Sequence, residues 1–287
     1  MRGTMTEKDN KQENKAETMA VRAALLVEEL QRKRPLVHCI TNYVTANDCA
    51  NILLAIGASP IMADDPEETG EIAASASALV LNMGTPSRRK LEAMVRAGKS
   101  ANEAGIPVIL DPVGAGASCL RREMAAQIIR EVKVDILRGN VSEISFAAGL
   151  DFCEKGVDVS EADQGRDRTE AALAAAERLG CTVAVTGSVD VVTDGSRVIR
   201  IHGGTPLMAR VTGTGCMTSA LSGAFAGAGK DPLTAVSAAL AAMGIAGELA
   251  FEKAGHIGCG SFHMALLDAV GNLNEKIIRE RAKIEER

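Results

Sequence analysis

Of the 287 residues, 46% are hydrophobic and 24% are charged, which is enough apolar material for one large or two smaller folded domains. A formal net charge of −5 at pH 7 argues against a surface that binds nucleic acid or an anionic membrane. The seven cysteines are scattered and form no C-x-x-C pair, so we expect neither a disulfide framework nor a zinc site, and we place the protein in the reducing cytoplasm.

The chain begins with a polar segment, residues 1–18, which lacks the apolar core of a secretory signal. Such a segment cannot bury enough apolar surface to offset its ordering entropy, so a disordered tail is expected. The most apolar segment, 233–251, is interrupted by glycines and polar residues, so no membrane-spanning helix is predicted.

After the tail, short apolar runs alternate with longer segments of helical pattern. Strands are predicted at 36–40, 59–63, 78–82, 107–110, 134–137 and 182–186. Helices are predicted near 45–56, 67–76, 86–104, 119–131, 141–148 and 167–179.

Several helix ends carry local signals. Thr85 followed by Pro86 is typical of an N-cap with proline at the first helical position, and Thr45 is typical of an N-cap as well. Gly105 and Gly180 stand where a glycine commonly ends a helix.

Strands that alternate with helices predict a parallel sheet with helices on both faces. The pattern changes near the C-terminus, where two strands at 190–193 and 197–202 flank Asp194-Gly195-Ser196 and predict a hairpin at the sheet edge. Helical segments follow near 214–228, 231–254 and 261–284. The polar stretch 151–168 is expected to be an exposed connection, so residues 19–287 form a single three-layer α/β/α domain with a mostly parallel sheet.

The most informative motif is VTGTGCMTSA at 211–220. Gly213 and Gly215 open a helix of small residues, and free backbone amides at a helix N-terminus attract anions. Such a nest of amides suits a phosphoryl group in transfer. A tight strand-to-helix turn explains the two glycines as well, since the motif is neither a Walker A sequence nor the Rossmann fingerprint.

The GTGC of this motif resembles the G-x-G-D anion hole of ribokinase-like kinases, with Cys216 in the place of Asp. With four further motifs in the same order, the chain resembles the hydroxyethylthiazole kinase family from about residue 22 to 270. These motifs are HCITNYV (38–44), GASPIM (57–62), DPVGAG (111–116) and RGNVSEI (138–144).

The resemblance implies a ribokinase-like fold and ATP-dependent phosphorylation of the hydroxyl of 4-methyl-5-(2-hydroxyethyl)thiazole, in thiamine biosynthesis or salvage. It also implies Mg²⁺ as cofactor and a homotrimer with each active site at a subunit boundary.

The resemblance assigns roles within the glycine motif. Gly213 would contact the thiazole, and the amides of Gly213 through Cys216, which include those of Thr214 and Gly215, would hold the phosphoryl group of ATP. Cys216 would lie nearest the substrate hydroxyl as the base, and a helix N-terminus favours the thiolate that a base requires. The alternative is that Cys216 is a small residue packed beneath the loop.

Outside the glycine motif, Met62 and Asn42 would line the thiazole pocket, although a Met after a short strand is otherwise a core residue. Arg138 and Thr186 match family positions that contact ATP, and both fall at predicted strand ends, where open α/β sheets bind ligands. Arg121 is a further candidate for phosphate contact.

Two acidic residues are the candidates for Mg²⁺. Asp111 directly follows the predicted strand 107–110, and Glu143 lies three residues after Asn140, as in the N-x-x-E element of the superfamily. The alternative for Glu143 is a first-turn carboxylate that complements the helix dipole.

Three other functions remain open at this point. The same fold could phosphorylate another vitamin precursor such as hydroxymethylpyrimidine, or it could serve an ADP- or ATP-dependent NAD(P)HX dehydratase. A nucleotide-binding sensor without turnover is the third alternative. The cysteine at position 216 and the HCITN block favour the thiazole kinase.

Overall fold

The computed structural model describes residues 18–150 and 161–286, with backbone alone for 161–167. The predicted disordered tail therefore lies outside the described residues, apart from Thr18. Likewise, the first ten residues of the predicted connection 151–168 lie outside them.

A nine-stranded sheet forms the middle of the molecule, in the order β2-β1-β3-β4-β5-β6-β7-β8-β9. The first six strands in this order are parallel, and the last three add in antiparallel fashion. Their bounds are β1 (Leu36–Ile40), β2 (Ser59–Ile61), β3 (Ala78–Asn82), β4 (Val108–Asp111), β5 (Ile136–Asn140), β6 (Thr182–Thr186), β7 (Val189–Thr193), β8 (Val198–His202) and β9 (Lys283–Glu286).

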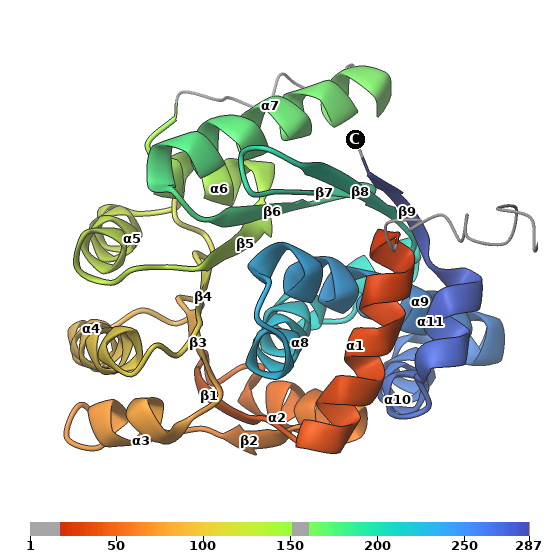
Figure 1. Ribbon diagram of the computed structural model, residues 1–287, viewed down its shortest axis with the longest axis horizontal. Helices are drawn as coiled ribbons and strands as arrows, with labels where there is room; N and C mark the ends of the chain where they lie inside the picture. Colours follow the sequence, from red (N-terminus) through yellow and green to blue (C-terminus); the bar gives the residue numbers. More distant parts are fainter. Residues whose placement is uncertain (1–17, 151–160, 287) are drawn as a thin grey trace, which may run out of the picture.

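Helices cover both faces of the sheet, as predicted, so the architecture is a three-layer α/β/α sandwich (Figure 1). One face is covered by α3 (Thr69–Ser75), α4 (Arg88–Glu103), α5 (Cys119–Glu131), α6 (Val141–Ala148) and α7 (Glu161–Leu179). The other is covered by α1 (Met19–Lys33), α2 (Ala46–Ile56), α8 (Thr214–Ala228), α9 (Pro232–Ala254), α10 (Cys259–Gly271) and α11 (Glu275–Arg281). A short 3₁₀ helix, η1 (Pro206–Arg210), precedes α8.

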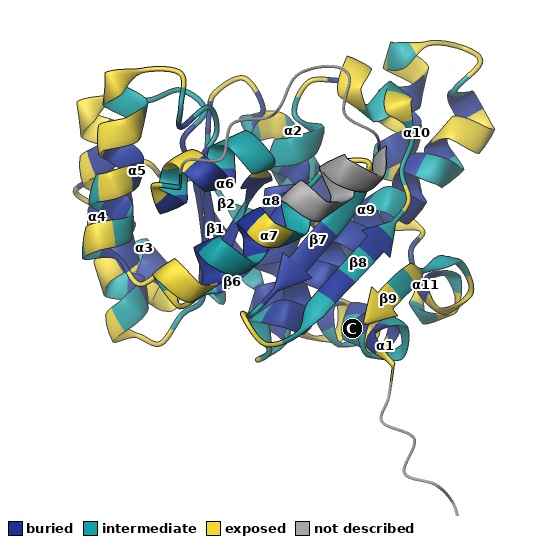
Figure 2. Cartoon of the chain, turned by 90° about the horizontal axis from the view of Figure 1, so that it is seen from above, coloured by how far each residue is buried: buried dark blue, intermediate teal, exposed yellow. Residues whose placement is uncertain are grey.

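The two hydrophobic cores lie on opposite faces of the sheet because successive side chains of a strand point to opposite sides. In β3, Leu79 and Leu81 belong to the core under α4, whereas Ala78 and Val80 belong to the core under α8. Every residue of β3 is buried, as expected for a parallel strand covered on both faces. In Figure 2 the strands β6 and β7 are accordingly largely dark blue, whereas the edge strand β9 is yellow and exposed residues lie on the outward faces of α4 and α5.

Helix α9 is long and apolar enough to cross a membrane, but 83% of its most apolar window is buried inside the protein. It packs against α1, α8 and α10, so its apolar character is that of a core helix.

Two elements differ from the sequence-based prediction. Helix α1 was not predicted, although Val27 and Leu30 face the core at helical spacing and Thr18 accepts a hydrogen bond from the Val21 amide as its N-cap. The predicted helix 261–284 is instead α10, α11 and the edge strand β9, with Asn274 capping α11. Because β9 pairs with β8, the predicted hairpin is not at the edge of the sheet.

The helix-end signals were partly right. Gly105 and Gly180 follow α4 and α7 with φ of +70° and +65°, as predicted. The start of α4 was predicted two residues too early, since Ser87 is its N-cap and accepts a hydrogen bond from the Lys90 amide. Helix α7 already begins at Glu161, so the second part of the predicted connection 151–168 is helical.

The contact between α8 and the sheet requires glycine at position 223. A Cβ there would lie 2.5 Å from Val80 Cγ2 and 2.9 Å from Val37 Cγ1. We expect Gly223→Val to lower the free energy of unfolding by about 1–3 kcal/mol or more, because the added methyl groups overpack the core. Urea denaturation measures the change. Gly260→Ala on α10 is the control, since a Cβ there meets no atom within 4 Å; an equal loss in both variants would contradict the prediction.

Candidate active site

The polar residues of the site follow from the direction of the strands. Asn82, Asp111, Asn140 and Thr186 are the last residues of β3, β4, β5 and β6, and because these strands are parallel they end at one edge of the sheet. The helix that follows β1, α2, covers one face, whereas the helix that follows β3, α4, covers the other. This reversal makes the crevice between the ends of β1 and β3 the expected ligand-binding point.

Helix α8 begins directly over this crevice. Its N-cap is Gly213, with φ of +87°, a conformation that side chains other than glycine rarely adopt. A Cβ on Gly213 would lie 2.7 Å from Thr45 Cγ2, so the starts of α8 and α2 are in close contact. Thr45 occupies the predicted N-cap position of α2, but its side chain makes no capping hydrogen bond.

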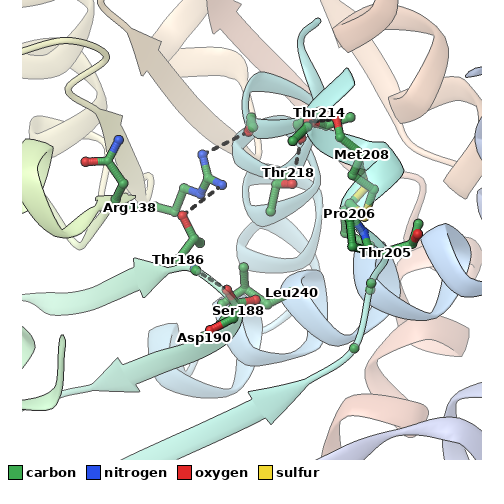
Figure 3. Close-up of a pocket in the computed structure, with 18 residues that line it drawn as sticks. Arg138, Thr186, Ser188, Asp190, Thr205, Pro206, Met208, Thr214, Thr218 and Leu240 are labelled. Atoms are coloured by element: carbon green, nitrogen blue, oxygen red, sulfur yellow. Dashed lines mark hydrogen bonds between the residues drawn. The ribbon is translucent and has the colours of Figure 1, made fainter. Parts of the chain in front are cut away.

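A pocket of about 810 Å³ lies beside the start of α8 (Figure 3). The predicted ATP residues Arg138, Thr186, Thr214 and Gly215 all line it. Arg138 donates hydrogen bonds to the Gly215 carbonyl at 3.1 Å and to Thr186 Oγ1 at 3.3 Å. These four residues therefore come together as the sequence predicted.

The other walls of the pocket, which strand β7, the 3₁₀ helix η1 and helix α9 help to form, were not predicted. They include Asp190 on β7, Met208 on η1 and Gly244 on α9. Burial raises the pKa of Asp190 to about 6, against the opposing effects of the Gly187 amide and of the charges of Arg138 and Arg168. An Asp two residues after the T-G-S turn that ends β6 was the signal available in the sequence.

Arg121 is not brought together with these residues. Its guanidinium donates to three backbone carbonyl oxygens, those of Met83 at 2.9 Å, Val113 at 2.6 Å and Gly84 at 2.7 Å. It lines a separate pocket beside Lys90. Arg121 therefore holds together the loops that follow β3 and β4, and the geometry does not support the predicted phosphate contact.

Asp111 lies at the centre of the site with 1% of its surface exposed. Its Oδ2 accepts hydrogen bonds from Ser219 Oγ at 2.7 Å and Asn82 Nδ2 at 2.8 Å, and it lies 3.8 Å from Arg138 Nη1. Oδ1 is buried and has no hydrogen-bond partner within the described part of the chain. Burial raises the pKa of Asp111 to about 6, although Arg138 and Ser219 oppose the rise.

Glu143 is near Asp111, since its charge contributes to the raised pKa of that carboxyl. It forms a capping box with Asn140 at the start of α6, in which Glu143 Oε2 accepts from the Asn140 amide. Its Oε1 accepts from the Gly114 amide at 2.9 Å. The alternative role of Glu143, a carboxylate in the first turn of a helix, is thus present in the structure. Within residues 18–150 and 161–286, no group of three acidic, His or Cys side chains forms a ready metal cage.

Cys216 and Asn42 meet, as the predicted roles require. Asn42 Nδ2 lies 3.3 Å from Cys216 Sγ, and Asn82 Nδ2 lies 3.4 Å from the same sulfur. Cys216 is partly exposed and also packs against the core under α8, so its surroundings accommodate both a base and a packing role. Asn82 was missed by the sequence reasoning, although a polar residue at the end of an apolar strand was a usable signal.

Met62, the remaining predicted substrate residue, follows β2 and packs against the core under α8. It does not line the 810 Å³ pocket. The neighbouring Ala63 carbonyl lies 2.8 Å from His38 Nε2, which ties the end of β2 to β1.

Comparison with known proteins decides the family. Residues 27–276 match the hydroxyethylthiazole kinase family. The hydroxyethylthiazole kinase of Ruminiclostridium cellulolyticum is 55% identical over 262 residues, which cover 91% of this chain and 96% of that protein. The corresponding protein of Clostridium beijerinckii is 52% identical over 271 residues, or 93% of this chain and 98% of that protein.

The chain belongs to the hydroxyethylthiazole kinase family. The structure of the family's protein from Pyrococcus horikoshii superposes with a TM-score of 0.84 at 43% identity and covers 92% of this chain and 98% of that one. Bacillus subtilis pyridoxal kinase, solved as an ADP complex, has a TM-score of 0.55 at 20% identity over 74% of this chain and 90% of that one. That second likeness shows the ribokinase-like fold alone.

The raised pKa of Asp111 predicts how stability depends on pH. Between its ordinary value of 3.8 and about 6, the folded protein holds the proton that the unfolded chain has lost, so wild-type stability falls as pH rises through this range. The Asp111→Asn variant lacks this titration. We therefore expect its Tm relative to wild type to rise between pH 4 and pH 7, measured by circular dichroism.

Asp190, whose pKa is raised to about 6 as well, is present in both proteins, so its effect cancels in the difference. A Tm difference that stays constant with pH would show that Asp111 does not titrate in this range.

Proposed function

We propose that this protein transfers the terminal phosphoryl group of ATP to the hydroxyl of 4-methyl-5-(2-hydroxyethyl)thiazole, as the names of its relatives suggest. Family membership supports this activity over a hydroxymethylpyrimidine kinase, an NAD(P)HX dehydratase and a sensor without turnover. The observation that carries it is the position of Cys216. This residue directly follows Gly215, which lines the 810 Å³ pocket, and its sulfur contacts the side-chain amides of Asn42 and Asn82.

ATP would occupy the 810 Å³ pocket with its phosphates at the start of α8. The amides of the first turn and the N-terminal end of the helix dipole attract anions there. Arg138 is 89% buried at its side chain and bridges Gly215, Thr186 and Asp111, so it can neutralise phosphate charge without a large rearrangement.

The thiazole would bind on the other side of Cys216. Asn42 contacts the sulfur from the loop after β1, and Gly213 faces Thr45 at the start of α2. Met62 would contribute from the end of β2. The substrate hydroxyl would then lie beside Cys216, within reach of the phosphoryl group held by the amides of α8.

Mg²⁺ is part of the proposal, and Asp111 fits it best. Its buried Oδ1 has no hydrogen-bond partner in the part of the chain that is described, and carboxylate oxygens or their bound waters are what Mg²⁺ requires. Both oxygens of Glu143 already accept backbone hydrogen bonds, so Glu143 would act through a water. When bound, Mg²⁺ would neutralise the charge of the β- and γ-phosphates.

Cys216 would accept the proton of the substrate hydroxyl. Phosphoryl transfer has a loose transition state, so orientation and charge stabilisation matter more than early removal of that proton. Cys216 would therefore contribute less to the rate than the amides around it.

The proposed homotrimer and cytoplasmic location rest on separate features. Tyr43 is 81% exposed and Val44 57% exposed, directly after Asn42, so a second subunit could cover this apolar pair and close the thiazole side. The proposed location rests on the cysteines, which are scattered in sequence and of which the six described are free, since reducing compartments keep thiols unpaired.

The substrate is tested directly. We expect the protein with ATP and Mg²⁺ to phosphorylate the hydroxyethylthiazole, with ADP and the phosphate ester detected by mass spectrometry. Hydroxymethylpyrimidine is the competing alcohol in a parallel reaction. Much faster turnover of the pyrimidine would contradict the proposed substrate, and turnover without any divalent cation would contradict the proposed cofactor.

Variants at the start of α8 distinguish the two possible roles of Cys216, a catalytic base or a packing residue. We expect Cys216→Ala to lower kcat by about 10²-fold, the low end for a general base. Cys216→Asp should keep substantial activity, because the carboxylate restores a base. Gly213→Val should be more damaging, since its Cβ collides with Thr45 in a backbone conformation that valine avoids.

Gly195→Val is the matched control for Gly213→Val, because Gly195 also has a positive φ, +92°, but its Cβ would be unobstructed in the β7–β8 hairpin. It should lower stability and leave kcat unchanged. A silent Cys216→Ala beside an inactive Gly213→Val would show that Cys216 only packs.

A further inference from the structure

Asn82 is the most completely bonded side chain of the site. It is 1% exposed, and a buried carboxamide is costly unless its donors and acceptors are paired. Its Nδ2 donates to Asp111 Oδ2 at 2.8 Å and lies 3.4 Å from Cys216 Sγ. Its Oδ1 accepts from Asn42 Nδ2 at 3.0 Å and from the Gly84 amide at 2.9 Å. All four hydrogen-bonding positions of the carboxamide are in use.

The orientation of this carboxamide is determined by the backbone. The Gly84 amide can only donate, so the atom of Asn82 that faces it must be the oxygen. The Thr45 amide determines the orientation of Asn42 in the same way, because it donates to Asn42 Oδ1 at 3.1 Å. Both side-chain nitrogens are thereby turned toward the sulfur of Cys216.

We infer that Asn82, on the proposed function, is a positioning residue whose two Nδ2 hydrogens join Asp111 to Cys216. Asp111 lies on β4 at the phosphate side of the site, and Cys216 lies on α8 at the hydroxyl side. One rigid amide on β3, in register with Asp111, sets the separation of the two groups. It also presents one hydrogen to each acceptor, so a change at this carboxamide reaches both groups.

This role makes a specific demand on residue type. A carboxylate of the same shape could not donate to either acceptor when ionised, and it would add a negative charge beside Asp111. Ser219 provides a matched comparison, since it donates to Asp111 alone. Asn82→Asp therefore removes donors from both groups, whereas Ser219→Ala removes a donor from Asp111 only.

The test measures kcat and KM together with the reactivity of Cys216. The rate at which iodoacetamide alkylates the Cys216 peptide, followed by mass spectrometry, reports the thiolate and needs no substrate. We expect Asn82→Asp to lower kcat by about 10²-fold with a small change in the KM of ATP, and to slow Cys216 alkylation severalfold. Ser219→Ala should lower kcat but leave the alkylation rate as in wild type.

Two results would overturn the inference: an Asn82→Asp variant with wild-type kcat, or one whose Cys216 alkylation matches that of Ser219→Ala. If Asn82→Asp does not fold, Asn82→Ser replaces it; with one hydroxyl hydrogen it can serve only one acceptor, so kcat or alkylation must still fall. A wild-type protein that does not phosphorylate the thiazole would refute the proposed function, while the alkylation comparison would still decide the role of Asn82.

Discussion

The short distance between α8 and the sheet is the constraint on which the site depends. Gly223 lets the helix approach Val80 and Val37 so closely that no other residue fits without movement. Ser219 and Cys216 lie one and two turns earlier on the same face of α8, because residues three, four and seven apart share a helix face. The contact that buries the helix therefore also sets how far Ser219 reaches toward Asp111, and Cys216 toward Asn82.

The acidic groups of this site surround one positive charge, the guanidinium of Arg138. Arg138 faces Asp111 at 3.8 Å, and its charge lowers the pKa of both Asp111 and Asp190 against the stronger effect of burial. Glu143 acts in the opposite direction on Asp111. These four residues therefore comprise three acidic side chains and one cation. A bound metal ion and the positive end of the α8 dipole would both lower the repulsion among the acidic groups.

The sequence predicted the parts of the fold that local pattern controls. Apolar runs identified β1, β3 and β6 at their observed bounds, and the polar residue after one such run identified Asp111. Helix α1 was overlooked beside a polar tail, and the charged edge strand β9 resembles a continued helix in sequence, since only its pairing with β8 makes it a strand.

Within the site, the limits of prediction have the same physical origin. The local sequence of the glycine motif determines the turn that begins α8, so Gly213 and Cys216 could be identified as site residues from the sequence. Arg121 was not, because three loop carbonyls that come together only in the fold decide what its guanidinium binds. Asn82 and Asn42 are 40 residues apart in sequence, and their hydrogen bond exists only once β1 and β3 are neighbours.

Helix α1 has a consequence for how the protein is made. Its partners are α8, α9, α11 and β9, and the ion pair between Arg22 and Glu286 joins positions 264 residues apart. A ribosome releases the chain from its N-terminus, so α1 is synthesised before every one of these partners. Until those partners have been synthesised, the apolar face of α1 remains available to chaperones or to other nascent chains, and the nine-stranded sheet is completed only when β9 leaves the exit tunnel.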